Sequence, residues 1–181
     1  TALMFMNLAI LGLDMASLEP TVLFQSSYGP RPYAGPGADS GGPRCVSCHD
    51  VSPEGSYIAV FSQVEAETPD RFDAPNGFLT VLAMPERRVV AQLPHAFMPV
   101  FSPVDEDTQL FSQVDETIGA KNQMVLPQGD LHVLDLQTGD HHPLPGAADP
   151  RRVENFPAWS PDGETVAFVR TGLDEIMHGS E

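Results

Sequence analysis

The densest group of chemically reactive side chains lies in residues 44–50, which read RCVSCHD. The segment contains both cysteines of the chain, Cys45 and Cys48, followed directly by His49. The spacing C-x-x-C-H suits covalent attachment of haem c: two thiols add across the two vinyl groups of the ring, and the next residue offers an imidazole as proximal ligand of the iron. We therefore predict one covalent haem c, held by Cys45 and Cys48, with His49 on the iron.

Three other interpretations of the two cysteines are a structural disulfide, a thioredoxin-like redox pair and half of a zinc site. A redox pair normally follows a strand and opens a helix, whereas this motif follows Ser-Gly-Gly-Pro and precedes a turn at residues 52–55. A zinc site needs a second pair of ligands, and the chain has no further cysteine. The pattern favours haem over these alternatives.

In these five residues the chain resembles the c-type cytochromes. The resemblance implies attachment after export, and hence a location in the periplasm or on the extracellular side of a bacterial membrane. It also implies electron transfer, with the iron cycling between ferrous and ferric states. The preceding flank, residues 26–43, is rich in glycine and proline and contains Tyr28 and Tyr33. It is either a plain linker or a cover over a haem edge.

Three segments of the chain resemble one another, namely residues 51–63, 101–113 and 159–170. Each contains Ser-Pro, an acidic turn and an apolar strand, and the three serines (Ser52, Ser102 and Ser160) follow one another at steps of 50 and 58 residues. After the first two segments we predict hairpins at 77–93 and 130–144. A four-stranded unit repeated at roughly 40–50 residues is typical of a propeller blade.

The segment FPAWSPDGETVAFVR and strand pairs such as LHVLDLQTGDHHPL resemble the TolB-type β-propeller repeat. The second unit departs from the pattern, because VDED replaces the turn glycine. The resemblance implies innermost strands around a central channel, with binding at its mouth. We therefore predict a mostly β chain with an apolar N-terminal segment (1–25), a Gly/Pro-rich loop carrying the haem motif (26–50) and propeller blades (51–181), two complete and one partial.

Alignment of the three serines places Cys48 at the same repeat position as Met98 and Phe156. Equivalent positions in neighbouring blades lie around one rim, so Met98, with His95 three residues earlier, is the best-placed candidate for a sixth iron ligand. A second protein ligand makes an electron-transfer haem, whereas an open position permits ligand binding or catalysis. We expect low-spin iron held by His49 and by Met98 or His95; the competing interpretations are a core methionine and a loop histidine.

The other histidines have weaker claims as ligands. His141 and His142 follow a turn and are expected to be exposed; with Asp140 they form at most a weak metal site. His132 shares a strand face with leucines, which predicts a partly buried, hydrogen-bonded side chain. The acidic run 105–107 lacks the loop pattern and turn glycine of a calcium site, so a solvated loop is the better interpretation.

The net charge limits the classes of function that the chain can have. Twenty-five acidic residues face nine basic ones, for a net charge of −16 over 181 residues, which argues against a nucleic-acid binder. Beside a haem, this charge predicts a basic redox partner. The apolar run 2–13 is shorter than the roughly 20 residues that span a bilayer. We expect it to pack as a buried helix or strand on the domain or on a partner, and membrane association through either remains open.

Closed propellers have about four to eight blades, so the predicted blades suggest a fragment or a subunit of a larger assembly. We expect an electron-transfer subunit in an extracytoplasmic complex. The alternatives are a scaffold or docking subunit with a structural haem, and a haem enzyme with an open iron site. No serine-nucleophile motif, phosphate loop or dinucleotide fingerprint is present in the sequence.

Overall fold

Antiparallel β-sheet makes up the regular structure of this chain. The computed structural model describes residues 9–13, 16–17, 19–25, 45–63, 77–114 and 129–172. Every regular element in these ranges is a strand, which confirms the predicted mostly β class. Within them, no helix reaches the length and apolar character needed to cross a membrane. The Gly/Pro-rich flank 26–43, with its two tyrosines, lies outside the described residues.

The strands run in chain order. They are β1 (Ala9–Leu13), β2 (Pro20–Gln25), β3 (Cys45–Val51), β4 (Tyr57–Gln63), β5 (Gly77–Ala83), β6 (Arg88–Pro94), β7 (Ala96–Phe101), β8 (Thr108–Gln113), β9 (Asp130–Asp135), β10 (His141–Pro143), β11 (Arg152–Trp159) and β12 (Val166–Gly172).

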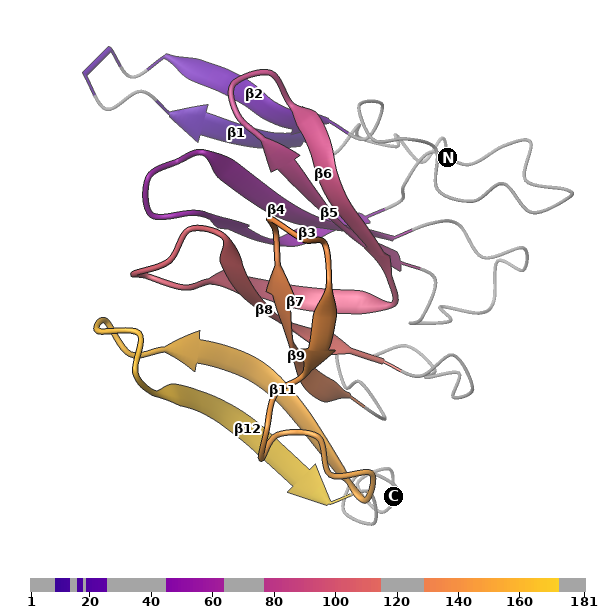
Figure 1. The fold of residues 1–181 in the computed structure, drawn as a ribbon. Coiled ribbons are helices and arrows are strands. Elements are labelled where there is room, and N and C mark those ends of the chain that lie inside the picture. Colours follow the sequence, from indigo (N-terminus) through magenta and orange to yellow (C-terminus); the bar gives the residue numbers. More distant parts are fainter. Residues whose placement is uncertain are drawn as a thin grey trace, which may run out of the picture.

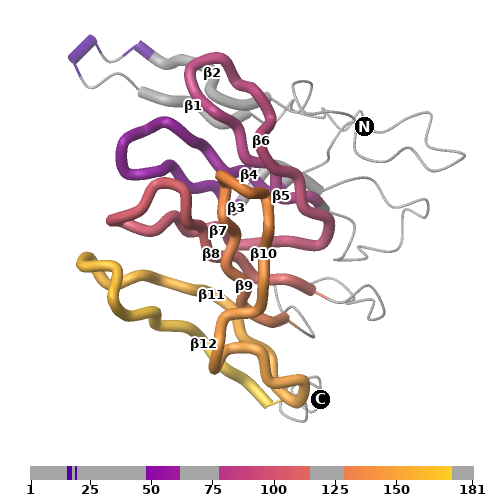
Figure 2. The backbone as a smooth tube through the Cα atoms, in the orientation of Figure 1, coloured from indigo at the N-terminus to yellow at the C-terminus, as the bar shows by residue number. Residues whose placement is uncertain are grey.

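Each strand pairs with its neighbour in sequence, so the sheets are simple meanders. We call β3-β4-β5-β6 the first sheet and β7-β8-β9-β10 the second sheet; β1-β2 and β11-β12 are two-stranded. Figure 1 shows the hairpins β1–β2, β3–β4, β7–β8 and β11–β12 following one another down the molecule. Figure 2 traces the succession from β3–β4 through β7–β8 to β11–β12 along the backbone. Strand β7 contacts both β3 and β11, so the leading strands of successive sheets are adjacent.

The two predicted hairpins are confirmed. Strands β5 and β6 enclose a turn at residues 84–87, and β9 and β10 enclose one at 136–140. Along β9, Leu131 and Leu134 are both fully buried although they lie on opposite faces. This confirms that the strand is covered on both sides.

The three register serines occupy equivalent positions at the end of β3, β7 and β11. Their backbone N–H groups each donate to the carbonyl oxygen at the start of the next strand, over distances of 2.8–3.0 Å. The intervening turns contain Gly55 (φ 77°) and Gly163 (φ 72°) in a conformation that favours glycine. The second unit turns without such a glycine, because the Oγ of Ser102 accepts from the backbone N–H of Asp105 (3.2 Å).

A second shared feature is a β-bulge within each leading strand. The pairing register shifts between residues 47 and 49 in β3, between 97 and 100 in β7, and between 155 and 158 in β11. The residue in each bulge has a left-handed backbone: Cys48 (φ 44°), Met98 (φ 50°) and Phe156 (φ 54°). Non-glycine residues rarely adopt this conformation, so its recurrence confirms the predicted alignment of the three positions.

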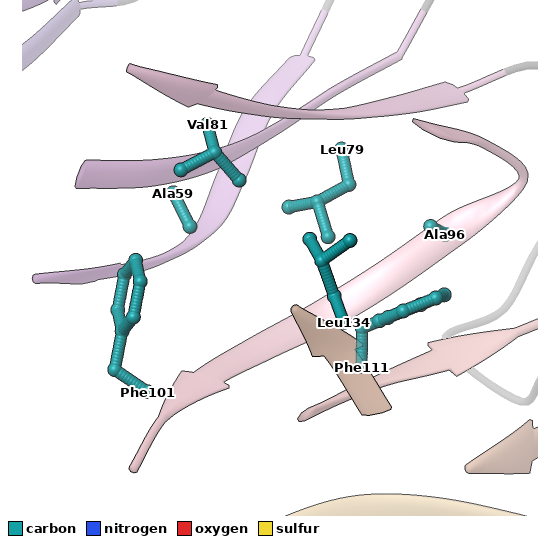
Figure 3. Close-up of a cluster of buried hydrophobic side chains, with 7 residues drawn as sticks. All are labelled: Ala59, Leu79, Val81, Ala96, Phe101, Phe111 and Leu134. Carbon is teal, nitrogen blue, oxygen red and sulfur yellow. The ribbon is translucent and has the colours of Figure 1, made fainter. Parts of the chain in front are cut away.

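The main hydrophobic core lies between the first and second sheets. It unites Ala59, Leu79 and Val81 of the first sheet with Ala96, Phe101, Phe111 and Leu134 of the second. Figure 3 shows these side chains facing one another between the two sets of strands. Ile58, Val60 and Leu82 form a separate cluster on the opposite face of the first sheet, since successive residues of β4 alternate between faces.

One expectation about the organisation of the chain is changed by the structure. The haem motif was expected in a loop before the blades, but Cys45–Val51 form strand β3 and pair with β4. The reason is that the bulge at Cys48 admits an extra residue without ending the pairing.

In the N-terminal segment, Ala9–Leu13 form a strand that pairs with β2. A strand is one of the two structures expected for the apolar run, and this segment contributes a sheet of its own.

Candidate haem site

The C-x-x-C-H residues lie on an edge strand. Among the described strands, β3 has one hydrogen-bonded neighbour, β4. The opposite edge of β3 carries no described strand, and the end of β3 that bears the motif adjoins β7 of the second sheet. One face of β3 packs toward the second sheet, so a group bound by this strand has access to its edge and to the face that bears His49.

Cys48 sits in the bulge and packs inward. Its half-buried side chain lies against a cluster formed by Phe61, Phe97 and Val114. The rings of Phe61 and Phe97, one from each sheet, are 4.4 Å apart between centroids. The Cys48 thiol is unpaired and so is available for bond formation at an apolar junction between the two sheets.

His49 lies on the other face of the first sheet. It pairs with Val60, whereas the next residue, Asp50, pairs with Ala59 of the main core. Directly paired residues share a face, so Asp50 points toward the second sheet and His49 points away from it. The imidazole is exposed. Cys48 and His49 are thus adjacent in sequence but project from opposite faces.

Cys45 begins strand β3 and pairs with Gln63. The bulge at Cys48 shifts the pairing register between Ser47 and His49, and the side chain of Cys45 lies outside the described part of the structure.

Met98 occupies the bulge of the adjacent strand β7. It packs against the same Phe61–Phe97–Val114 cluster as Cys48, as expected from their equivalent positions in the repeat. Since Met98 belongs to the second sheet and His49 lies on the face turned away from that sheet, the thioether and the imidazole stand on opposite sides of the first sheet.

His95 lies in the turn between β6 and β7, also with a left-handed backbone (φ 57°). Its carbonyl oxygen accepts from the backbone N–H of Val114 (3.0 Å), which places the residue beside the cluster that contains Met98. The side chain is half-buried. Of the two predicted sixth ligands, Met98 is the one that packs with Cys48.

These residues supply the chemical groups that haem c needs. Thiol, imidazole and thioether groups are the types that c-type haems use. The thiol of Cys48 and the thioether of Met98 share one apolar cluster, and the imidazole of His49 lies across the sheet from them. Because strand β3 lies between His49 and Met98, this conformation does not bring both side chains to one iron.

Sequence reasoning missed Asp50, which links the motif to the second sheet. Its Oδ2 accepts a hydrogen bond from the backbone N–H of Phe101 (2.7 Å). The bond fixes the end of β3 against β7, and hence the position of His49 relative to Met98. The sequence offers one signal for this contact, which is an acidic residue directly after the motif. The hydrogen-bond partner of Asp50 lies 51 residues away in the chain.

The acidic turn 105–107 is engaged in structural hydrogen bonds. Glu106 accepts from the hydroxyl of Ser52 (3.1 Å), and Asp107 accepts from the hydroxyl of Tyr57 (3.1 Å) and from the side chain of Gln137 (2.6 Å). Burial, the bond to Asp107 and the nearby negative charges raise the pKa of Tyr57. These carboxylates join the two sheets, which is a different role from the solvated loop expected.

The histidines of the second sheet lie far along the chain from the haem motif. His132 is half-buried and its Nδ1 lies 3.1 Å from Nδ1 of His141, which confirms the expected partly buried, hydrogen-bonded side chain. His141 and His142 are exposed, as expected. In the described part of the chain, no three His, Cys, Asp or Glu residues come together in a group that could hold a metal ion.

Comparison with known proteins gives a likeness to solved structures alone. No protein-family description matches the sequence, and no curated protein matches it. Among solved structures, the chain is similar to an oligogalacturonate lyase determined in complex with manganese, with a TM-score of 0.43 and 15% sequence identity. The match covers 88% of this chain and 50% of that protein, so this chain spans half the length of that neighbour.

Proposed function

We propose that this chain is an electron-transfer subunit that carries one covalent haem c, on the extracytoplasmic side of a bacterial membrane. One observation carries the proposal: in the C-x-x-C-H motif the unpaired thiol of Cys48 lies at an apolar cluster, and the imidazole of the adjacent His49 is exposed. Haem c, when bound, supplies one-electron chemistry at its iron.

The residues of the chain have distinct roles in this proposal. Cys45 and Cys48 would hold the ring through thioether bonds, and His49 would be the proximal ligand of the iron; Met98 would become a second protein ligand only if the packing of β3 against β7 changed. A haem with a second protein ligand would be suited to electron transfer rather than to binding a substrate at the iron. Phe61 and Phe97 form an apolar wall that limits access of water, which tunes the reduction potential.

We further propose that the sheets are blades of a β-propeller. Three features support this: the four-stranded meanders, the adjacency of β3, β7 and β11, and the bulge shared by these strands. In this arrangement β1–β2 and β11–β12 belong to blades that further strands complete. The net charge of −16 would attract a basic redox partner over long range.

The attachment of haem is tested by producing the chain in a host that exports it and matures c-type cytochromes. A pyridine haemochrome spectrum and haem staining after denaturing electrophoresis should show one covalent haem. Cys45→Ser and Cys48→Ser should each reduce covalent attachment, and the double variant should abolish it. A wild-type chain that is exported and folded but carries no covalent haem contradicts the proposal.

The sixth ligand is tested by optical and electron paramagnetic resonance spectra of Met98→Leu and His95→Gln. Both variants retain the attachment residues, so loss of haem does not confuse the result. Met98→Leu should convert the iron from low spin to high spin, and His95→Gln should leave it low spin. The reverse outcome transfers the role to His95, and low-spin iron in the double variant excludes both residues.

A second candidate function is that of a docking subunit whose haem is structural. The observation that favours it is the edge strand β12, which has one described neighbour, β11, and an exposed Val169. Such edges pair readily with another chain. Rapid, salt-dependent electron exchange with a basic cytochrome distinguishes the first candidate from the second, and binding of an exogenous ligand to the ferrous protein would instead indicate an open iron site.

A further inference from the structure

Two histidines meet on the second sheet, away from the haem motif. His132 on β9 and His141 on β10 are diagonal neighbours, since His132 pairs with Pro143 and His141 with Leu134. Their Nδ1 atoms are 3.1 Å apart. Both rings also pack on Phe111, with centroids 5.6 Å from that ring in each case.

The distance between the two nitrogens matches the span of two ligands on one metal ion. Imidazole nitrogens bind zinc at about 2.0–2.1 Å. For ligand–metal–ligand angles between square-planar and tetrahedral values, two such nitrogens are separated by about 2.8–3.4 Å. The observed 3.1 Å falls in this interval, so little movement is needed for both to reach the same ion.

The pair is also preorganised and accessible. Phe111 is fully buried and packs against both imidazoles. The strand pairing of β9 and β10 fixes the backbones of the two histidines. His141 is exposed, which leaves a path for an ion from solvent.

We propose that His132 and His141 form a binding site for a divalent late transition-metal ion, of the class to which Cu²⁺, Ni²⁺ and Zn²⁺ belong. Imidazole is a preferred ligand of these ions, and Cu²⁺ is bound most tightly in the series. In the described residues no third His, Cys, Asp or Glu joins the pair, so water completes the coordination. The strongly negative chain favours the approach of any cation. The site does not depend on the haem proposal.

The test is calorimetric titration of the purified full chain with Cu²⁺ and Zn²⁺ at neutral pH, comparing wild type with His132→Gln, His141→Gln and His142→Gln. The matched control is His142, an exposed histidine that adjoins His141 but pairs with Val133 and so lies on the other face of β10. We expect at least about a tenfold weaker affinity in the first two variants and a change of less than about twofold in the control.

Two results would overturn the proposal. One is an affinity for both ions in His141→Gln equal to that of wild type. The other is an equal loss in all three variants, which would indicate diffuse binding to surface histidines. Because His141 is exposed, its variant is expected to fold, and circular dichroism checks this. Nitrogen hyperfine structure in the Cu²⁺ resonance spectrum gives an independent count of the bound imidazoles.

Discussion

The second sheet contacts its two neighbours, the first sheet and the β11–β12 hairpin, through different kinds of interaction. Toward the first sheet it presents an apolar core in which Phe101, Phe111 and Leu134 are almost fully buried. Around this core, side chains such as Asp50 and Tyr57 make hydrogen bonds across the junction. We call this the apolar junction. The haem motif and Met98 lie at its end.

The junction toward β11–β12 contains a buried charged group. Glu154 of β11 has a side chain that is 0% exposed and pairs within the hairpin with the Nε of Arg170 of β12, at 2.8 Å. Outside the hairpin, Arg170 donates to the carbonyl oxygen of Gly146, and the backbone N–H of Glu154 donates to the carbonyl oxygen of Gly129. We call this the polar junction. The two residues that make these contacts are held by an ion pair, whereas the apolar junction relies on buried apolar area.

The difference shows how each junction tolerates change. Apolar burial stabilises in proportion to area and depends little on direction. A buried ion pair offsets its desolvation cost only while both partners remain in place. The apolar junction should therefore lose stability in proportion to the volume removed, whereas the polar junction should fail when one charge is deleted and recover when the other is deleted too.

The largest effect is expected in the apolar junction. Phe111→Ala removes a fully buried ring and should lower the free energy of unfolding by about 3–5 kcal/mol, measured by urea denaturation. The control is Val169→Ala, at a side chain that is 51% exposed, which should cost less than about 1 kcal/mol. Similar losses in the two variants would remove the distinction between buried and exposed apolar residues.

The polar junction is tested by Arg170→Met, which leaves the Glu154 carboxylate buried without its partner. We expect a loss of about 2–4 kcal/mol, below the range for a fully buried pair because the arginine side chain is 37% exposed. The double variant Arg170→Met with Glu154→Gln should recover part of this loss. A single variant as stable as wild type would show that the carboxylate reaches another partner or solvent.

A smaller loss is expected from the hydrogen bond that joins the two sheets at the haem motif. Asp50→Ala deprives the Phe101 N–H of its acceptor and should cost about 1–3 kcal/mol. Asp50→Asn keeps an oxygen acceptor and should cost less. If both variants unfold at the same urea concentration as wild type, the carboxylate does not fix β3 against β7.

The smallest effect concerns pH at the rim of the apolar junction. Burial, with the nearby positive charges of His141 and His142, lowers the pKa of His132 from 6.5 to about 4. The unfolded chain therefore binds a proton at higher pH than the folded chain does, and this contribution to stability is lost as the pH falls from about 7 to about 4. Solvent reaches the ring, so we expect the free energy of unfolding to fall by only about 1 kcal/mol over this pH range.

The check is thermal or urea unfolding across that pH range for wild type, His132→Gln and His142→Gln. The first variant should show a shallower loss of stability toward acid than wild type, and the second should stay closer to wild type, because His142 makes the smallest of the three contributions to the lowered pKa of His132. An unchanged slope in His132→Gln would assign the acid sensitivity to other groups.

Local patterns in the sequence were sufficient to predict the hairpins and the alignment of Ser52, Ser102 and Ser160, because alternation and turn residues act over a few positions. The equivalence of Cys48, Met98 and Phe156 followed from that alignment. The sheet face on which each residue of the motif lies could not be predicted. The bulge at Cys48 is visible only in the strand pairing, and it reverses the alternation of side chains between the two faces before His49. Contacts such as Asp50 with Phe101 or His132 with His141 depend on how strands pack, which no local pattern encodes.

Because the bulge recurs, the side chain at its position can differ from strand to strand without a change in how the strands pair. Cysteine, methionine and phenylalanine occupy the same backbone conformation in β3, β7 and β11, so a single codon change at such a position alters the available chemistry while the sheet keeps its register. Repeats of this kind can exchange the residue in the bulge while the pairing of the strands is kept. Positions 98 and 156 are, for the same reason, suitable places for engineered substitutions.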